Sequence, residues 1–78
     1  MSRTVSTRAE EQIDALWGGR HMHGLTFIIA GELARRSHPG RTPDTRRVYF
    51  EHEGLHLRAV VAVKPDGRFK RLLDLTKV

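Results

Sequence analysis

The chain contains no cysteine, and no apolar run in it reaches the ~18 residues that a membrane-spanning helix needs. Without cysteine, neither a disulfide framework nor a thiolate zinc site is available. Residues 1–8 also lack the apolar stretch of a secretory signal. We therefore expect a protein that neither enters a membrane nor is exported, and that resides in the cytoplasm.

Side chains for covalent catalysis and motifs for cofactor binding are scarce as well. Serine occurs only at positions 2, 6 and 37, and no Gly-x-Ser-x-Gly elbow is present. The spacing of Gly18, Gly19 and Gly24 fits neither a Walker-type phosphate loop nor a dinucleotide fingerprint. We therefore assign no catalytic residue and expect no nucleotide or other small-molecule cofactor.

Acidic residues are outnumbered, with 9 Asp and Glu against 14 Lys and Arg, which gives a net charge of +5 and a pI near 10.8. Only three of the 14 basic residues are lysine, so 11 are arginine. A surface of this kind attracts polyanions, and the guanidinium fork matches phosphate and carboxylate groups. Solubility alone also explains a net charge of this size.

The length of 78 residues predicts one small domain with a thin core, because so short a chain buries only about 60–65% of the surface that it exposes when unfolded. Within residues 1–78 we expect a flexible start at 1–6 and a Pro/Gly/Arg linker at 37–45. A homodimer or a bound partner would add stability to such a core.

Two helices are predicted in the first half of the chain. Thr7 and Glu10 have the spacing of a capping box, which predicts a helix that begins there and ends at Gly18. A second helix is expected over residues 25–37, with apolar positions 25, 28, 29 and 33 at helical spacing. The run Leu25–Ala30 also fits a buried strand, but helix-forming residues follow it and favour the helix.

The second half predicts three antiparallel strands. Glu53-Gly54 marks a tight hairpin turn that places His52 opposite Leu55 and lines up the alternating apolar residues from Arg46 onward. Lys64–Gly67 has the composition of a second turn, so a third strand follows it. We expect Phe69, Leu73 and Leu75 to face the core, and Tyr49, Val60, Ala62 and Leu72 to face outward. The predicted fold class is α+β, with two N-terminal helices packed on a three-stranded antiparallel β-meander (α-α-β-β-β).

His52 to His56 spells the H-E-x-x-H motif of zinc hydrolases. In those enzymes the motif lies on a helix, which brings both imidazoles to one metal ion. A hairpin through Glu53-Gly54 instead sends the two rings to opposite faces, so a zinc hydrolase is disfavoured and no metal site is assigned. The roles of His21, His23 and His38, which would form a cluster only if the linker folded back, stay open.

Antiparallel pairing brings the start of the first strand beside the end of the second, so basic residues from three segments converge at one edge of the sheet. We take this edge as the candidate binding site, with Tyr49 and Arg58 paired beside it on the outward face. Its residues are Arg41, Arg46, Arg47, Tyr49, Arg58, Lys64, Arg68 and Lys70.

The first functional hypothesis is a non-enzymatic binding or regulatory protein. The basic edge would engage an acidic protein surface or a nucleic-acid backbone. Very small α+β proteins without cysteine or cofactor are often encoded by mobile elements to block larger complexes. An inhibitory role is therefore part of this hypothesis.

The alternative is an enzyme. Two helices followed by an antiparallel sheet resemble the core of RelE-type toxins, which are metal-independent endoribonucleases, over residues 9–75. The resemblance implies that His56 acts as acid or base and that Arg58 stabilises phosphoryl charge. The chain lacks the opening strand and the terminal catalytic motif of that family. A DNA-reading helix-turn-helix is a third reading, although the apolar second helix is a poor recognition helix.

Overall fold

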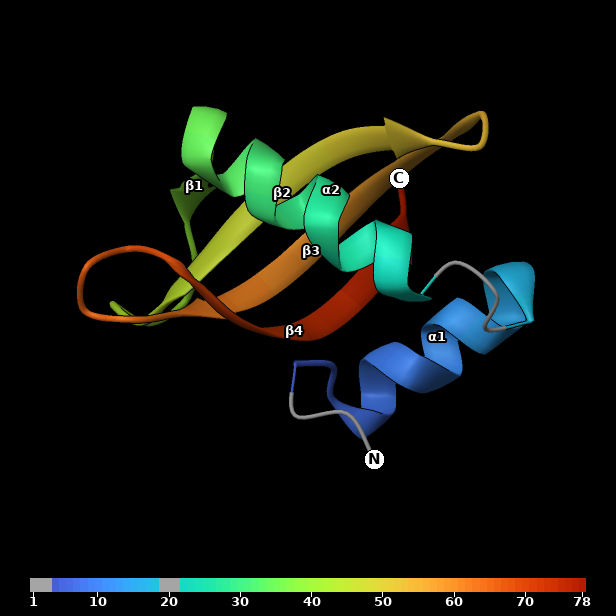
Figure 1. The fold of residues 1–78 in the computed structure, drawn as a ribbon, viewed down its shortest axis with the longest axis horizontal. Coiled ribbons are helices and arrows are strands. Elements are labelled where there is room, and N and C mark those ends of the chain that lie inside the picture. The colour runs from blue at the N-terminus through green and yellow to red at the C-terminus, as the bar shows by residue number, and fades with distance from the viewer. Residues whose placement is uncertain (1–3, 19–21) are drawn as a thin grey trace.

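The computed structural model describes residues 4–18 and 22–78, without the side chains of residues 22 and 23. Its elements in chain order are α1 (Thr7–Trp17), α2 (Met22–Arg35), β1 (His38–Pro39), β2 (Thr45–His52), β3 (Leu55–Val63) and β4 (Phe69–Lys77) (Figure 1). The strands form one antiparallel sheet in the order β1-β2-β3-β4. The α+β class is confirmed. The sheet has four strands rather than three because the predicted linker contributes the two-residue β1.

The cap of α1 lies one residue earlier than the sequence predicts. Ser6, not Thr7, is the N-cap, and its hydroxyl accepts a hydrogen bond from the Ala9 amide at 3.1 Å. The same hydroxyl donates to the Leu73 carbonyl at 2.8 Å, so the cap also fastens the helix to β4. The helix ends as expected at Gly18, which has a φ of 70°.

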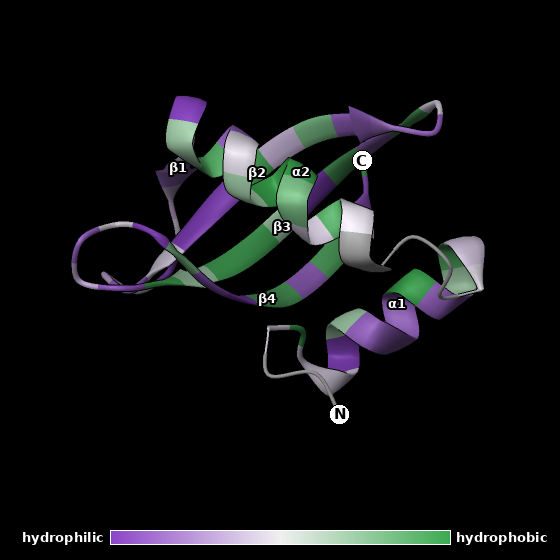
Figure 2. Ribbon diagram, in the orientation of Figure 1, coloured by the Kyte–Doolittle hydropathy of each residue, from purple (hydrophilic) through white to green (hydrophobic). Residues whose placement is uncertain are grey.

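The run from residue 25 to residue 30 is helical, as favoured. Leu25, Ile29 and Leu33 recur on one face of α2 and are buried. Much of α2 is hydrophobic along its length, whereas α1 alternates with charged residues (Figure 2). The Phe27 side chain is 81% exposed on the outer surface of α2. Neither described helix is long and apolar enough to cross a membrane.

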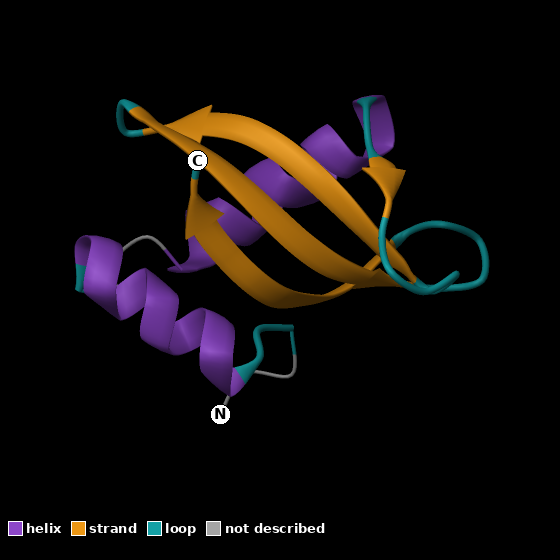
Figure 3. Cartoon of the chain, turned by 180° about the vertical axis from the view of Figure 1, so that it is seen from behind, coloured by secondary structure: helices purple, strands orange, loops and turns teal. Residues whose placement is uncertain are grey.

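The helices and the sheet form two layers, but the two helices pack against different parts of the sheet. α2 crosses one face of the sheet, while α1 runs beside β4 at the edge (Figures 1 and 3). Apolar side chains from both helices and from the three long strands form the core, together with Val5: Ala9, Ile13, Leu25, Ile29, Leu33, Val48, Phe50, Leu57, Ala59, Val61, Val63, Leu72 and Leu75. The opposite side of the sheet, here called the open face, is covered by no helix of the described chain (Figure 3).

The predicted hairpin register is confirmed. His52 pairs with Leu55, Phe50 with Leu57 and Val48 with Ala59. The turn residues Glu53 and Gly54 have φ values of 54° and 77°, which is the backbone of a tight two-residue hairpin turn. Because a hairpin occupies this segment, the helix that a zinc-hydrolase motif requires does not form.

The side chains of β4 do not all point to the predicted faces of the sheet. Leu72 is fully buried and Leu73 is only partly buried, although an unbroken alternation places Leu73 inside and Leu72 outside. The cause is a β-bulge, because Val60 pairs with Asp74 and Val61 with Leu72, which leaves Leu73 without a partner on β3. A second shift, between Ala62 and Val63, similarly skips Lys70.

The N-terminal segment lies against β4 over its described residues. The Leu72 amide donates to the Thr4 carbonyl at 2.7 Å, and the Ser6 amide donates to the Leu72 carbonyl at 2.8 Å. These bonds place Val5 beside Leu72 in a parallel bridge, and Val5 is 1% exposed. Val5, which was predicted to belong to a flexible start, is thus part of the core.

Candidate functional site

Along the strands, buried apolar side chains alternate with side chains that point to the open face, and most of the latter are polar or charged. On β2 and β3, Arg47 pairs with Val60 and Tyr49 pairs with Arg58. β1 adds His38 beside Arg47, and β4 adds Asp74 beside Val60. Since directly paired residues point to the same side of a sheet, these side chains form two neighbouring rows.

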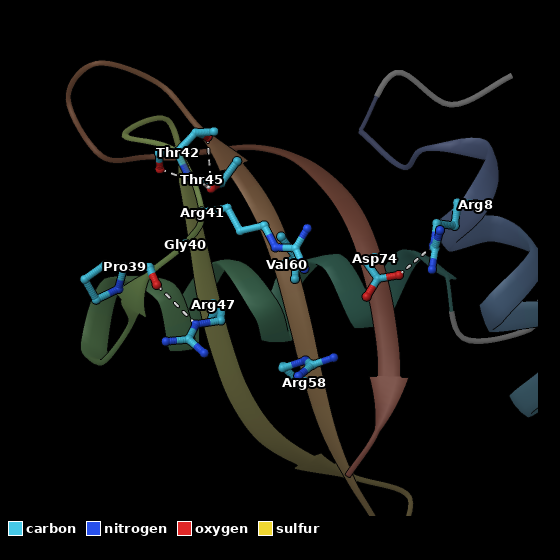
Figure 4. A pocket seen from close by; sticks show the side chains of 10 residues that line it. All are labelled: Arg8, Pro39, Gly40, Arg41, Thr42, Thr45, Arg47, Arg58, Val60 and Asp74. Carbon is cyan, nitrogen blue, oxygen red and sulfur yellow. Dashed lines mark hydrogen bonds and ion pairs between the residues drawn. The ribbon is translucent and has the colours of Figure 1, made fainter.

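A hollow of about 740 Å³ lies on this face. Four arginines line it, and each comes from a different segment: α1, the loop after β1, β2 and β3 (Figure 4). We call it the arginine hollow, and its lining residues are Arg8, Pro39, Gly40, Arg41, Thr42, Thr45, Arg47, Arg58, Val60 and Asp74.

The loop that carries Arg41 is held close to β2. The Gly40 amide donates to the Thr45 carbonyl at 3.1 Å, and a Cβ on Gly40 would come within 2.8 Å of that carbonyl. Only glycine allows this approach. The Thr42 hydroxyl donates to Asp44 Oδ1 at 2.6 Å and lowers the pKa of that carboxyl below its ordinary value of 3.8. Arg41 therefore extends over the sheet from an ordered loop (Figure 4).

The one carboxylate that lines the arginine hollow is already bonded. Arg8 Nε lies 2.8 Å from Asp74 Oδ1, and Gln12 Nε2 donates to the same oxygen at 2.7 Å. Gln12 Oε1 in turn accepts from the Leu75 amide at 2.7 Å, so α1 is fixed to β4 at this point. The carboxylate of Asp74 is largely shielded, with 19% of its side chain exposed. The hollow therefore has an excess of positive charge.

The remaining arginines are held to different degrees. Arg47 Nε donates to the Pro39 carbonyl at 3.1 Å, which orients its guanidinium across the face. Within the described chain, the guanidinium groups of Arg41 and Arg58 have no hydrogen-bond or ion-pair partner. Arg58 Nε is buried, as is the Oγ1 of Thr76, which pairs across from Arg58 and also has no partner among the described residues. A buried unpaired donor costs about 1–3 kcal/mol, so this nitrogen of Arg58 adds no stability to the isolated fold.

The structure divides the basic residues that the sequence groups together. Arg41, Arg47 and Arg58 line the arginine hollow, whereas Arg46, Lys64 and Lys70 line a second hollow of about 660 Å³ near the 64–67 turn. Consecutive residues of a strand point to opposite faces, so Arg46 and Arg47 diverge. Arg46 lies on the helix side and bonds Ser37, from Nε to Oγ at 3.0 Å and from a terminal nitrogen to the carbonyl at 3.2 Å.

Arg68 and Tyr49 take separate positions. Arg68 lines neither hollow, because its Nε bonds Asp66 Oδ2 at 2.7 Å within the turn. This contact lowers the pKa of the Asp66 carboxyl below its ordinary value of 3.8. Tyr49 is 44% exposed on the open face beside Arg58, as its pairing predicts.

Arg8 was missed by sequence reasoning. No local signal identifies it, since its place depends on α1 lying along the β4 edge. Arg71 was missed too, and it pairs with Ala62 on the open face because of the β4 bulges. Knowledge of the bulges was needed to place it.

The histidines do not come together where the structure describes them. His52 meets Trp17 edge to face on the core side, with ring centroids 5.5 Å apart, while His56 Nε2 lies 3.8 Å from Glu51 Oε2 on the open face. His38 packs edge to face against Tyr49 at 5.5 Å. His21 and the side chain of His23 lie outside the described residues. The described residues contain no group of three or more potential metal ligands.

No protein-family model, curated protein or solved structure matches the chain. The open face is therefore the feature of the molecule that points to a ligand. Its hydrogen-bonding groups are mainly guanidinium donors, which suits a ligand rich in acceptor oxygens.

Proposed function

We propose that the chain is a non-enzymatic binding protein that engages the phosphate backbone of a nucleic acid through the arginine hollow. The observation that carries this proposal is the gathering of four guanidinium groups from four segments around one concave surface. The only acid in the lining, Asp74, is already bonded by Arg8 and Gln12. Arg41 and Arg58 therefore have donors to offer to phosphate oxygens.

A nucleic-acid backbone fits this surface better than an acidic protein does. Protein interfaces have an apolar centre with aromatic anchors, surrounded by a polar rim. The arginine hollow has the reverse arrangement, because Pro39 and Val60 supply the apolar side chains of its lining and four arginines outnumber them. Repeated contacts with phosphates need a surface that is lined mainly by basic side chains.

Binding by itself would be the activity of such a protein. A chain of 78 residues that occupies a nucleic-acid backbone excludes larger complexes from the same stretch. This agrees with the inhibitory or regulatory role that we expect for a small basic binding protein.

The proposal is tested by the salt dependence of binding to a labelled random-sequence nucleic acid, measured by fluorescence anisotropy. Each phosphate that the protein neutralises contributes about −0.7 to −0.9 to the slope of log affinity against log salt. Because Asp74 already neutralises Arg8, the other three arginines give an expected slope of about −2 to −3. The double variant Arg47→Gln, Arg58→Gln should weaken binding and reduce the slope by about 2.

The matched control is Arg35→Gln, Arg36→Gln, which removes the same charge at the end of α2, on the other side of the sheet. Arg35 is 80% exposed there and lies 3.6 Å from Glu32. This control should leave the slope nearly unchanged. Equal losses in the two double variants would mean that net charge alone drives binding. Absent or salt-insensitive binding would refute the proposal and favour an acidic protein partner.

One observation favours the ribonuclease alternative as a second candidate. His56 and Arg58 both lie on the open face, two positions apart on β3, so they border the same surface. A metal-independent nuclease would cleave labelled RNA in the presence of EDTA, and His56→Ala would abolish the cleavage. Intact RNA after incubation with the unaltered protein would exclude this function.

A further inference from the structure

We infer that the nucleic acid bound by this chain is single-stranded and that one of its bases stacks on Tyr49. The inference rests on the proposed function and adds the class of nucleic acid to it. The structural basis is an exposed aromatic ring on the open face, adjacent to the arginines that would hold the backbone. Ring and arginines together match the two requirements of single-strand binding, a stacking platform and a cationic track.

The position of Tyr49 is defined by its neighbours. It pairs directly with Arg58 on β3 and lies two residues from Arg47 on β2, and both arginines line the arginine hollow. Two residues of a strand span about 7 Å, which lets one nucleotide place its base on the ring and its phosphate on Arg47. The His38 ring meets Tyr49 at an interplanar angle of 74° and restricts its rotation.

A double helix could not use this ring. The faces of its bases are covered by their neighbours in the stack, whereas an unpaired strand can splay a base onto an aromatic side chain. Tyr49 is 44% exposed, so an unpaired base can reach its ring from solvent. Tyr49 therefore distinguishes single strands from duplexes by chemistry that the arginines alone do not provide.

The charges on β2 also indicate which way the bound nucleic-acid strand runs across the open face. Along the open face of β2 the order is Arg47, Tyr49 and then Glu51, which pairs with His56 near the hairpin turn. The Glu51 carboxylate would repel a phosphate. The backbone is thus expected to run from Tyr49 toward Arg41 and away from the hairpin turn.

The test compares three ligands of equal length: a single-stranded oligonucleotide, the same strand with abasic sites in place of bases, and the duplex. RNA and DNA versions of the first two show which sugar is preferred. The unaltered protein should bind the single strand more tightly than the abasic strand or the duplex. Tyr49→Ala should weaken binding to the single strand by about fivefold to a hundredfold and leave binding to the abasic strand unchanged.

Two further variants separate stacking from other effects. Tyr49→Phe keeps the ring and should retain the preference for the single strand, which shows that the phenol hydroxyl is not the cause. Glu51→Gln should tighten binding to the single strand and to the abasic strand alike, because it acts on the backbone. Thermal unfolding of each variant verifies that it is folded.

The failure of this inference differs from that of the proposed function. If the duplex binds as tightly as the single strand, or if Tyr49→Ala weakens all three ligands equally, base stacking is refuted while backbone binding stands. If none of the three ligands binds in a salt-dependent way, the proposed function itself is refuted. The inference holds only if the loss in Tyr49→Ala is confined to ligands with unpaired bases.

Discussion

Arg58 is the residue whose position is hardest to explain by stability. Its Nε is buried without a partner among the described residues, next to Thr76 Oγ1 in the same condition. Arg46 lies on the helix side of the sheet, and its guanidinium, by contrast, donates two hydrogen bonds to Ser37. The two arginines thus allow a comparison between a proposed binding role and a structural role.

We predict that Arg58→Met leaves the free energy of unfolding unchanged or raises it, because the substitution removes an unpaired buried donor and keeps most of the side-chain volume. Arg46→Met serves as the matched control and should lower the free energy of unfolding by about 1–2 kcal/mol, since it breaks the bonds to Ser37. Urea denaturation followed by circular dichroism measures both. A clear destabilisation by Arg58→Met would show that Arg58 supports the fold.

Among the elements, the β2–β3 hairpin has a turn residue that is poorly suited to its backbone. Glu53 has a φ of 54°, in the left-handed region that asparagine and glycine tolerate best. We predict that Glu53→Asn raises the free energy of unfolding by about 0.5–1 kcal/mol, because Asn-Gly favours this turn. The midpoint of chemical denaturation, compared between this variant and the unaltered protein, measures the change.

Gly54→Ala supplies the contrast at the neighbouring position, where φ is 77°. A Cβ there is strained, so stability should fall by about 1 kcal/mol or more. A loss of stability in Glu53→Asn as well would mean that contacts of the Glu53 side chain outweigh the preference of the backbone.

The elements also show which parts of the fold can be predicted from the sequence. The helices and the register of the β2–β3 hairpin depend on local periodicity and on Glu53-Gly54, so they were predicted. The bulge at Leu73 was not, because a Leu-Leu-Asp-Leu run fits an unbroken strand equally well. β1 was missed since a strand of two residues containing Pro39 has no periodicity to detect.

At the scale of the whole molecule, the grouping of charges was only partly predictable. Pairing in the sheet correctly placed Tyr49 beside Arg58. The single basic edge, however, divided into two hollows because Arg46 and Arg47 point to opposite faces. Arg8 could not be placed from sequence, since its contact with Asp74 bridges 66 positions in the chain. Tertiary packing alone determines such contacts.

The docked N-terminal segment carries a prediction at this scale. Val5 is 1% exposed against Leu72, so Val5→Ala should lower the free energy of unfolding by about 2 kcal/mol through lost burial and a small cavity. The matched control is Val78→Ala at a position that is 64% exposed, and it should have almost no effect. Equal midpoints of thermal unfolding for the two variants would show that the buried Val5 side chain adds nothing to stability.

The contact between residues 4–6 and β4 has a further consequence for how copies of the chain behave together. An unpaired strand edge is a template on which other chains add strands and grow into fibres. Here Thr4 and Ser6 occupy hydrogen-bonding groups on the β4 flank, and the other flank is β1, where Pro39 has no amide hydrogen to donate. The docked segment thereby blocks the outer edge of β4 at Leu72, and we expect removal of residues 4–6 to expose these hydrogen-bonding groups to strand addition by another copy of the chain.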